Sequence, residues 1–157
     1  MRDRVFEPIG EEECLDLLKQ VEYGRVSVVT AEGRPEIFPV NFAVRGRTVV
    51  FVTGSDTLVA RAPSGHVAVE ADHIDPETHE GWDVVVSGEG TDITKAVDSF
   101  ALLARTYAIV SWVPGRKDHW ISVLNPHFSG RRLSHRELQP GAASQGEPWA
   151  GAGEHCA

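Results

Sequence analysis

The feature that most constrains this chain is a change in the spacing of its apolar residues at Gly24. Beyond it, apolar and polar side chains alternate with a period of two, which is typical of β-strands that bury one face. We expect strands at residues 25–30, 36–44, 48–53, 66–72, 82–89, 119–124 and 128–133. Short connections between the first three predict antiparallel hairpins. Six or seven such strands favour a mainly β fold, an antiparallel barrel whose closure removes exposed edges.

Helical spacing occurs in only a few places. A helix is predicted to begin after Gly10 as its N-cap, with the Glu13 side chain reaching back to the cap and with Ile9 and Cys14 in contact. Its apolar face consists of Cys14, Leu17, Leu18 and Val21. A short helix is expected at residues 57–62. A longer one is expected at residues 95–107, with Val97, Phe100, Ala101 and Ala104 on one face.

The length of 157 residues predicts one domain. We assign residues 1–137 to the barrel and residues 138–157, rich in Gly, Ala, Pro and Ser, to a disordered tail. A formal charge of −8 argues against a nucleic-acid binder. With no signal peptide and no apolar run of membrane-spanning length, we expect a cytoplasmic protein without membrane contact. The two cysteines are too few for a disulfide framework and form no metal-binding pair.

Five motifs occur in a fixed order: PVNF from Pro39, FVTG from Phe51, VAVEAD from Val67, GWDVVVSGEG from Gly81 and VPGRKDHW from Val113. This series resembles the pyridoxamine 5′-phosphate oxidase-like flavin-binding split barrels, and is most similar to their small actinobacterial members. The resemblance covers roughly residues 9–133. It implies a homodimer of split barrels that binds FMN between subunits. Members include oxidases, reductases and haem-binding proteins, so the fold alone does not define the reaction.

The resemblance also implies the site residues. The segment after the third strand would hold the flavin phosphate through Thr53, Ser55 and Thr57, because small residues that open a helix present backbone N–H groups. Many relatives carry a cation directly after this threonine, where this chain has Leu58. Arg61, or Arg116 and Lys117 farther along, would then supply the charge. The alternative for residues 53–57 is an ordinary capped helix.

Other candidates would face the flavin ring. A proline within a strand marks an edge or a bulge, so Pro39 and Val40 are expected beside the ring and Asn41 would address its polar rim. Trp82 offers a stacking surface, although a core tryptophan would have the same sequence signature. In the last motif, His119 is the best candidate for proton donation, with Asp118 to orient it and Trp120 beside it. The alternative there is a dimer-interface network without chemistry.

The resulting hypothesis is an FMN-dependent oxidoreductase acting on a small molecule. A cofactor that supplies the redox chemistry explains why no strong nucleophile or acid–base motif is present. Three alternatives remain open. These are a deazaflavin-dependent reductase on the same barrel, a flavin- or haem-binding module without activity, and a metal-dependent hydrolase built on the His- and acid-rich loop at residues 73–80. That loop lacks a recognised metal-ligand spacing, so we expect no metal site.

Overall fold

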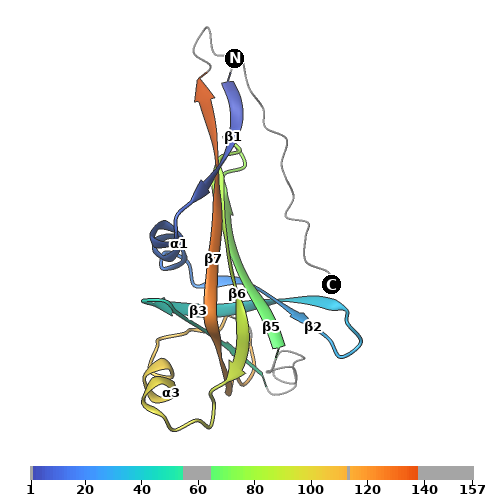
Figure 1. Cartoon of the computed structure of the whole chain (residues 1–157), viewed down its shortest axis with the longest axis vertical. Coiled ribbons are helices and arrows are strands. Elements are labelled where there is room, and N and C mark those ends of the chain that lie inside the picture. Colours follow the sequence, from blue (N-terminus) through green and yellow to red (C-terminus); the bar gives the residue numbers. More distant parts are fainter. Residues whose placement is uncertain (1, 55–64, 113, 138–157) are drawn as a thin grey trace.

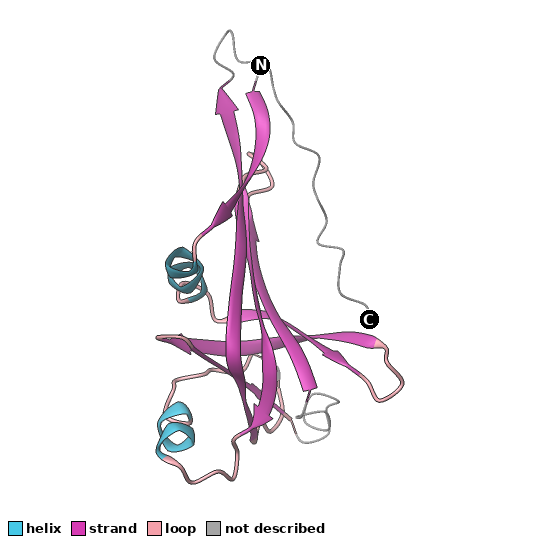
Figure 2. Ribbon diagram, in the orientation of Figure 1, coloured by secondary structure: helices cyan, strands magenta, loops and turns pink. Residues whose placement is uncertain are grey.

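Seven antiparallel strands make up most of the computed structural model, which describes residues 2–54, 65–112 and 114–137. Figures 1 and 2 show these strands curving around one another, with the described helices on the outside. The strands are β1 (Arg2–Ile9), β2 (Tyr23–Val29), β3 (Pro35–Arg45), β4 (Thr48–Thr53), β5 (Gly65–Ile74), β6 (Gly81–Asp92) and β7 (His119–Glu137). The mainly β class predicted from the sequence is confirmed.

The sheet closes on itself through its longest strand. Its order is β1-β7-β4-β3-β2-β5-β6, and β6 also pairs with β7. One side of β7 pairs first with β4 and then with β1, while its other side pairs with β6. This arrangement leaves six strands in a ring and adds β1 beside them. It agrees with the expected split barrel, because closure pairs strand edges that would otherwise be exposed.

Two features of the strands differ from the sequence prediction. The strands expected at 119–124 and 128–133 are one continuous strand, which passes through Asn125 at φ 49°. The pairing of β6 with β7 shifts register between Ser87 and Glu89, opposite this point, so the ladder absorbs the irregularity as a bulge. Strand β1 was not predicted, because its many charged residues and Pro8 hide any apolar alternation.

The first helix and its N-cap residue, Gly10, are confirmed, but the predicted hydrogen bond of Glu13 is not. Helix α1 (Glu11–Leu18) begins after Gly10 and buries Cys14, Leu17 and Leu18. Its cap receives no side-chain hydrogen bond, so the predicted role of Glu13 is wrong. Instead, the Glu13 carboxylate accepts a hydrogen bond from Arg132 on β7. The helix is thereby held to the barrel at its N-terminal end.

The second described helix, α3 (Ser99–Ala104), is shorter than the predicted 95–107. Asp98 is its N-cap, because its carboxylate accepts a hydrogen bond of 3.0 Å from the Ala101 backbone N–H. Ala101 and Ala104 are buried as predicted, but Val97 is 83% exposed and Phe100 is 40% exposed. The helix predicted at 57–62 lies outside the described residues.

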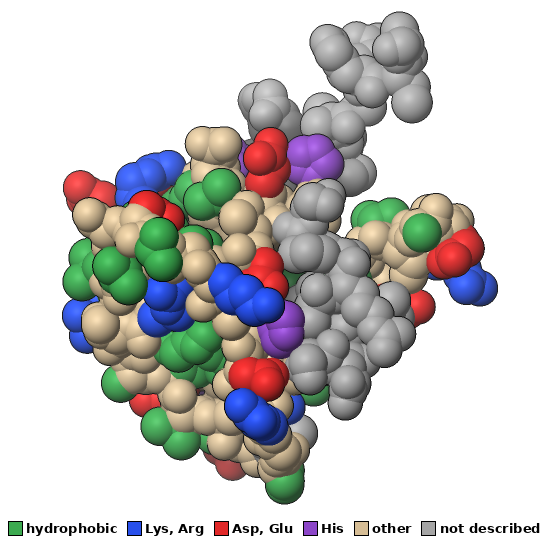
Figure 3. Space-filling model, turned by 90° about the horizontal axis from the view of Figure 1, so that it is seen from below, with side chains coloured by type: hydrophobic (Ala, Val, Ile, Leu, Met, Phe, Trp, Pro, Cys, Tyr) green, Lys and Arg blue, Asp and Glu red, His purple; other side chains and the backbone are tan. Residues whose placement is uncertain are grey.

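The buried side chains form two clusters on opposite faces of the barrel wall. The larger cluster fills the barrel and includes Phe42, Phe51 and Ile121. The smaller one lies between α3 and the outer face, around Val50 and Tyr107. On the end of the molecule seen in Figure 3, hydrophobic side chains are exposed between basic and acidic ones.

Candidate functional site

A pocket of about 430 Å³ opens where β2, β3 and β4 meet the segment that precedes β7. Aliphatic and aromatic side chains supply most of its walls, and a few polar groups lie among them. Such a composition is usual for small-molecule sites, where the apolar walls give affinity and the polar groups fix orientation. The lining residues are Tyr23, Phe38, Pro39, Val40, Asn41, Val52, Thr53, Ser111, Trp112 and Lys117.

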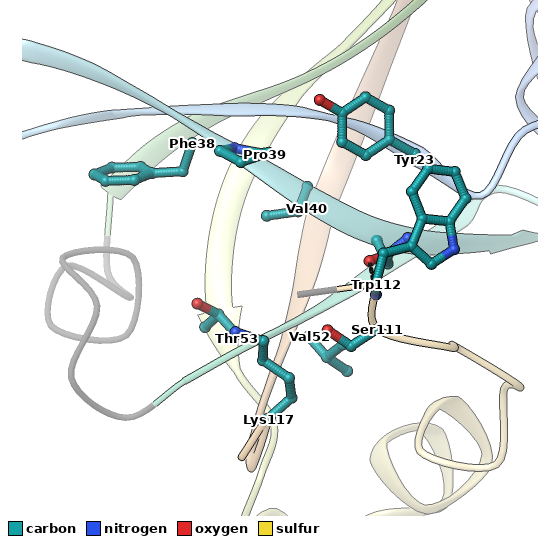
Figure 4. A pocket seen from close by; sticks show the side chains of 10 residues that line it. Tyr23, Phe38, Pro39, Val40, Val52, Thr53, Ser111, Trp112 and Lys117 are labelled. Atoms are coloured by element: carbon teal, nitrogen blue, oxygen red, sulfur yellow. Dashed lines mark hydrogen bonds between the residues drawn. The ribbon is translucent and has the colours of Figure 1, made fainter. Parts of the chain in front are cut away.

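Two aromatic rings make one wall of the pocket. Tyr23 and Trp112 stack with their centroids 5.3 Å apart and an angle of 8° between their planes. Tyr23 is 38% exposed and Trp112 is 61% exposed, so the pair keeps open surface toward solvent. We call these two side chains the aromatic shelf. Figure 4 shows both rings on the same side of the pocket. A flat surface of this kind suits a planar ligand.

Asn41 lies beneath the shelf and is only 5% exposed. Its Nδ2 donates a hydrogen bond of 2.9 Å to the Glu22 backbone carbonyl. Its Oδ1 accepts one of 2.9 Å from the Trp112 backbone N–H. The sequence analysis predicted that this amide would contact the polar rim of a flavin ring. In the structure, both of its polar ends bind the protein backbone.

The polar part of the pocket contains Thr53 and Lys117. Thr53 ends β4 and is buried, while Lys117 comes from the loop before β7 and is half-buried. Figure 4 shows both side chains on the side of the pocket away from Trp112. Lys117 is the basic side chain among the described residues that line the pocket, so this part of the pocket favours an anionic group.

A histidine–aspartate pair lies on the strands next to one pocket residue, Thr53, although neither member of the pair lines the pocket itself. His119 begins β7 opposite Thr53 of β4, and its Nδ1 is 2.9 Å from Asp92 Oδ2. Burial raises the pKa of the Asp92 carboxyl. Hydrogen bonds from Thr94 and the contact with His119 outweigh this effect, so the pKa stays below its usual value. An ionised partner of this kind fixes the orientation of the imidazole ring.

The orienting residue proposed from the sequence was Asp118, and the structure assigns that role to Asp92. The Asp118 carboxylate is instead 3.3 Å from Arg116 Nε. Asp92 could not be recognised from the sequence, because it precedes His119 by 27 residues. The ladder between β6 and β7 brings the two residues together.

Five predicted residues, Pro39, Val40, Asn41, Thr53 and Lys117, line the pocket. Others lie elsewhere. Trp82 packs against the core from β6, Trp120 packs in the smaller cluster, and the Arg116 side chain is 89% exposed. Trp82 is therefore not among the described residues that line this pocket. The predicted residues Ser55, Thr57 and Arg61 lie outside the described part of the chain.

The sequence reasoning missed the aromatic shelf. Tyr23 stands directly before Gly24, where the apolar period changes, and Trp112 stands directly before the VPGRKDHW motif. Both aromatics therefore adjoin features that had been recognised. The available signal was an aromatic residue outside the apolar alternation. An aromatic residue of the core would be expected within that alternation.

The acidic loop between β5 and β6 forms a second, polar hollow with Arg4 and His135. His135 Nδ1 is 3.2 Å from Glu80 Oε1, and Arg4 lies 3.1 Å from His79 Nδ1. In the described ranges, no three His, Cys, Asp or Glu side chains are grouped so that they could hold a metal ion. Within the same ranges, no helix is long and apolar enough to cross a membrane.

Known proteins provide an independent comparison. The model of the pyridoxamine 5′-phosphate oxidase family matches residues 10–132. A solved FAD binding protein from Mycobacterium smegmatis is 34% identical, with a TM-score of 0.67 over 81% of this chain and 98% of that protein. A FAD-binding protein from Mesorhizobium loti, 21% identical, shares the fold with a TM-score of 0.63 over 83% of this chain and 99% of that one.

A curated relative extends the comparison to sequence alone. The uncharacterized protein Rv0080 of Mycobacterium tuberculosis is 38% identical over 92 residues, which are 55% of this chain and 60% of that protein. The matched part of this chain thus spans less than two thirds of the relative. The family match covers both the barrel strands and the pocket described above. The chain therefore belongs to the pyridoxamine 5′-phosphate oxidase family.

Proposed function

We propose that this chain is a flavin-binding protein and that it carries out redox chemistry on a small molecule. The observation that carries the proposal is the pocket, in which apolar walls and an aromatic shelf are combined with Lys117. A flavin nucleotide has the same two parts, a planar ring system and a phosphate. The 34% identity to a FAD binding protein from Mycobacterium smegmatis supports the same ligand class.

The lining residues fit such a ligand in a definite way. Pro39, Val40 and Val52 would pack against the ring system, and the aromatic shelf would cover part of its face. Lys117 would attract the phosphate. It would thereby supply the positive charge that many relatives carry at the position of Leu58. A bound flavin supplies hydride and electron transfer. The protein contributes the shape of the pocket, the exclusion of water and the position of the phosphate.

The His119–Asp92 pair favours an enzyme over a passive carrier. A flavin-dependent reaction on a small molecule can use a side chain to deliver or accept a proton, and histidine is suited to that task. Asp92 holds the His119 ring in one orientation from 2.9 Å. His119 would carry the proton at Nε2, the ring nitrogen that does not face Asp92.

Haem is less well supported by the same pocket. Its iron needs an axial ligand such as histidine, cysteine, methionine or tyrosine. Of these, Tyr23 is the one found among the described lining residues, and its ring is stacked on Trp112. A deazaflavin has the same planar ring shape as a flavin, so the pocket walls alone do not distinguish these two. FMN is the first choice because one phosphate would match one lysine.

The test is a titration of the purified protein with FMN, FAD, a deazaflavin coenzyme and haem, followed by absorbance. We expect submicromolar to micromolar binding of a flavin and a shifted flavin band. Trp112→Leu should weaken that binding about tenfold, because a ring on an aromatic surface gains roughly 1–3 kcal/mol. Leu103→Ala is the matched control, since Leu103 is equally exposed at 59% but lies on α3. Binding of haem alone, or no binding, would contradict the proposal.

We also propose that the chain forms a homodimer. Ile37 is 67% exposed and Val29 is 55% exposed, and both lie toward the turn of the β2–β3 hairpin, whose other end lines the pocket. Burying these side chains against a second copy would remove apolar surface from water. Sedimentation analysis tests this proposal, and Ile37→Glu should shift the molecule toward the monomer. A monomeric parent protein at micromolar concentration would refute it.

A further inference from the structure

The geometry around Asn41 carries an inference that rests on the proposed function. The orientation of its amide is fixed by its two partners. The Trp112 backbone N–H can only donate, so it faces Oδ1, and the Glu22 carbonyl can only accept, so it faces Nδ2. At 5% exposure, these hydrogen bonds are shielded from competition by water.

These two bonds act on the backbone that carries the aromatic shelf. Glu22 directly precedes Tyr23, and the other partner is Trp112 itself. Tyr23 is also the register partner of Asn41 between β2 and β3. One buried amide therefore joins two segments 90 residues apart in the sequence. It does so at the point where their rings stack 5.3 Å apart.

The position of the segment that contains Trp112 depends on its hydrogen bond to Asn41 more than the position of a strand would. Residues 108–112 belong to no helix or strand, so no ladder of backbone hydrogen bonds defines their position. The Trp112 ring is 61% exposed, so core packing holds it only in part. A ring that is free to reorient must be ordered again whenever a ligand stacks on it, and this ordering reduces affinity.

We infer that Asn41 is a positioning residue, which pre-orders the aromatic shelf for a planar ring without touching that ring itself. This differs from the prediction that the Asn41 amide contacts the flavin rim. It also assigns the shelf a single function, the stacking of a flat heteroaromatic ligand such as the proposed flavin. Asn41 thereby affects the affinity of the site through the geometry of Tyr23 and Trp112.

Asn41→Asp tests this inference by making the tether depend on pH. A protonated carboxyl has one donor and one acceptor, so it can replace both hydrogen bonds of the amide. An ionised carboxylate still accepts from the Trp112 N–H but cannot donate to the Glu22 carbonyl. We therefore expect the shelf to be ordered at low pH and loosened at high pH in the variant only.

Two readouts follow the shelf. The first is the near-ultraviolet circular dichroism of the unliganded chain, in which the contribution of the shelf is the difference from Trp112→Leu. The second is FMN affinity, which should be about tenfold weaker in Asn41→Asp than in the parent at pH 8. It should recover toward the parent value once the pH is low enough to protonate the new carboxyl, whose pKa burial at this position raises. Asn41→Leu should be weakened at both high and low pH, and the parent measured at both provides the pH control.

The outcomes separate the inference from the proposed function. Parent-like circular dichroism and FMN affinity in Asn41→Asp at every pH would overturn it. Weakened FMN binding with an unchanged shelf signal would also overturn it, because Asn41 would then contact the ligand directly. If the parent binds no flavin, the proposed function fails, and the shelf signal of the unliganded chain still tests the role of Asn41.

Hydrogen exchange provides a test that needs no variant. The Trp112 amide donates to a buried acceptor, so it should exchange at least about tenfold more slowly than the amide of exposed Val110 in the same segment. Equal exchange rates at the two positions would overturn the inference even if the Asn41 variants do not fold.

Discussion

Replacing Asp92 by Asn tests the physical basis of the His119 site. The Asp92 carboxylate meets His119 through Oδ2 at 2.9 Å and accepts from the Thr94 backbone N–H through Oδ1 at 2.8 Å. Asn keeps the shape and can still accept the Thr94 bond through its carbonyl oxygen. The substitution therefore removes the negative charge and leaves the local turn in place.

The size and sign of the effect follow from the environment of the pair. The side chains of His119 and Asp92 are 28% and 27% exposed, so their interaction is partly shielded from solvent. A charged hydrogen bond in such a place contributes roughly 1–2 kcal/mol to the free energy of unfolding. The folded-state pKa of Asp92 lies below its usual value. This contribution is therefore fully present above the ordinary aspartate pKa of about 4 and is lost as the pH falls through the lowered value.

Urea denaturation of the parent and of Asp92→Asn should be measured at several pH values from about 5.5 down to 2. The difference in unfolding free energy should be largest near pH 5 and should shrink toward zero in acid. A cycle with His119→Gln isolates the pair, and the double variant should lose less than the sum of the single ones. A difference that stays constant over this pH range would refute the assigned ionisation and the orienting role of Asp92.

Three further predictions concern the pocket, the barrel wall and the buried thiol. Lys117→Gln should weaken the affinity for FMN several-fold and make that affinity less dependent on salt. The affinity for riboflavin, which has no phosphate, should not change, and equal losses of affinity for both ligands would refute the phosphate role. Gly24→Ala should destabilise the chain by about 2 kcal/mol or more, because the new Cβ would lie 2.3 Å from the Glu70 carbonyl oxygen, whereas Gly65→Ala meets nothing within 4 Å. Equal denaturation midpoints for these two variants would contradict that packing. Burial is the main cause that raises the pKa of the Cys14 thiol, so in a Cys156→Ser background a thiol reagent should react at the rate of unfolding and not immediately on mixing.

Much of the fold could be predicted because it depends on local patterns. The alternation after Gly24 identified the strands from β2 to β6, and Gly10 identified the start of α1. Strand β1 escaped prediction because its pairing with β7, from Arg2↔Glu137 to Ile9↔Gly130, depends on a partner more than 120 residues away. A strand without apolar alternation has no local signal, and only the neighbouring edge defines it.

The candidate site likewise has features that the sequence predicts and features that depend on tertiary contacts. Pro39, Asn41 and Thr53 were identified from the sequence because they lie in the PVNF and FVTG motifs, which resemble those of the family. Their roles could not be predicted in the same way. The sequence does not show whether the amide of Asn41 contacts a ligand or, as in the structure, the backbone of Glu22 and Trp112. Assigning the amide required knowledge of which segments lie beside it.

The sequence alone determined the mainly β class, the antiparallel order of the hairpins and the family, because period, turn spacing and motif order are properties of neighbouring residues. Only the tertiary structure decided that Asp92 and not Asp118 orients His119, that Trp82 packs against the core, and that Tyr23 and Trp112 stack in the pocket. The pairing of β6 with β7 brings Asp92 to His119, and the hydrogen bonds of Asn41 hold the Trp112 segment against β2, so each contact joins segments that no local pattern relates. A functional site built from such contacts depends on which strands meet, and this is a property of the whole barrel.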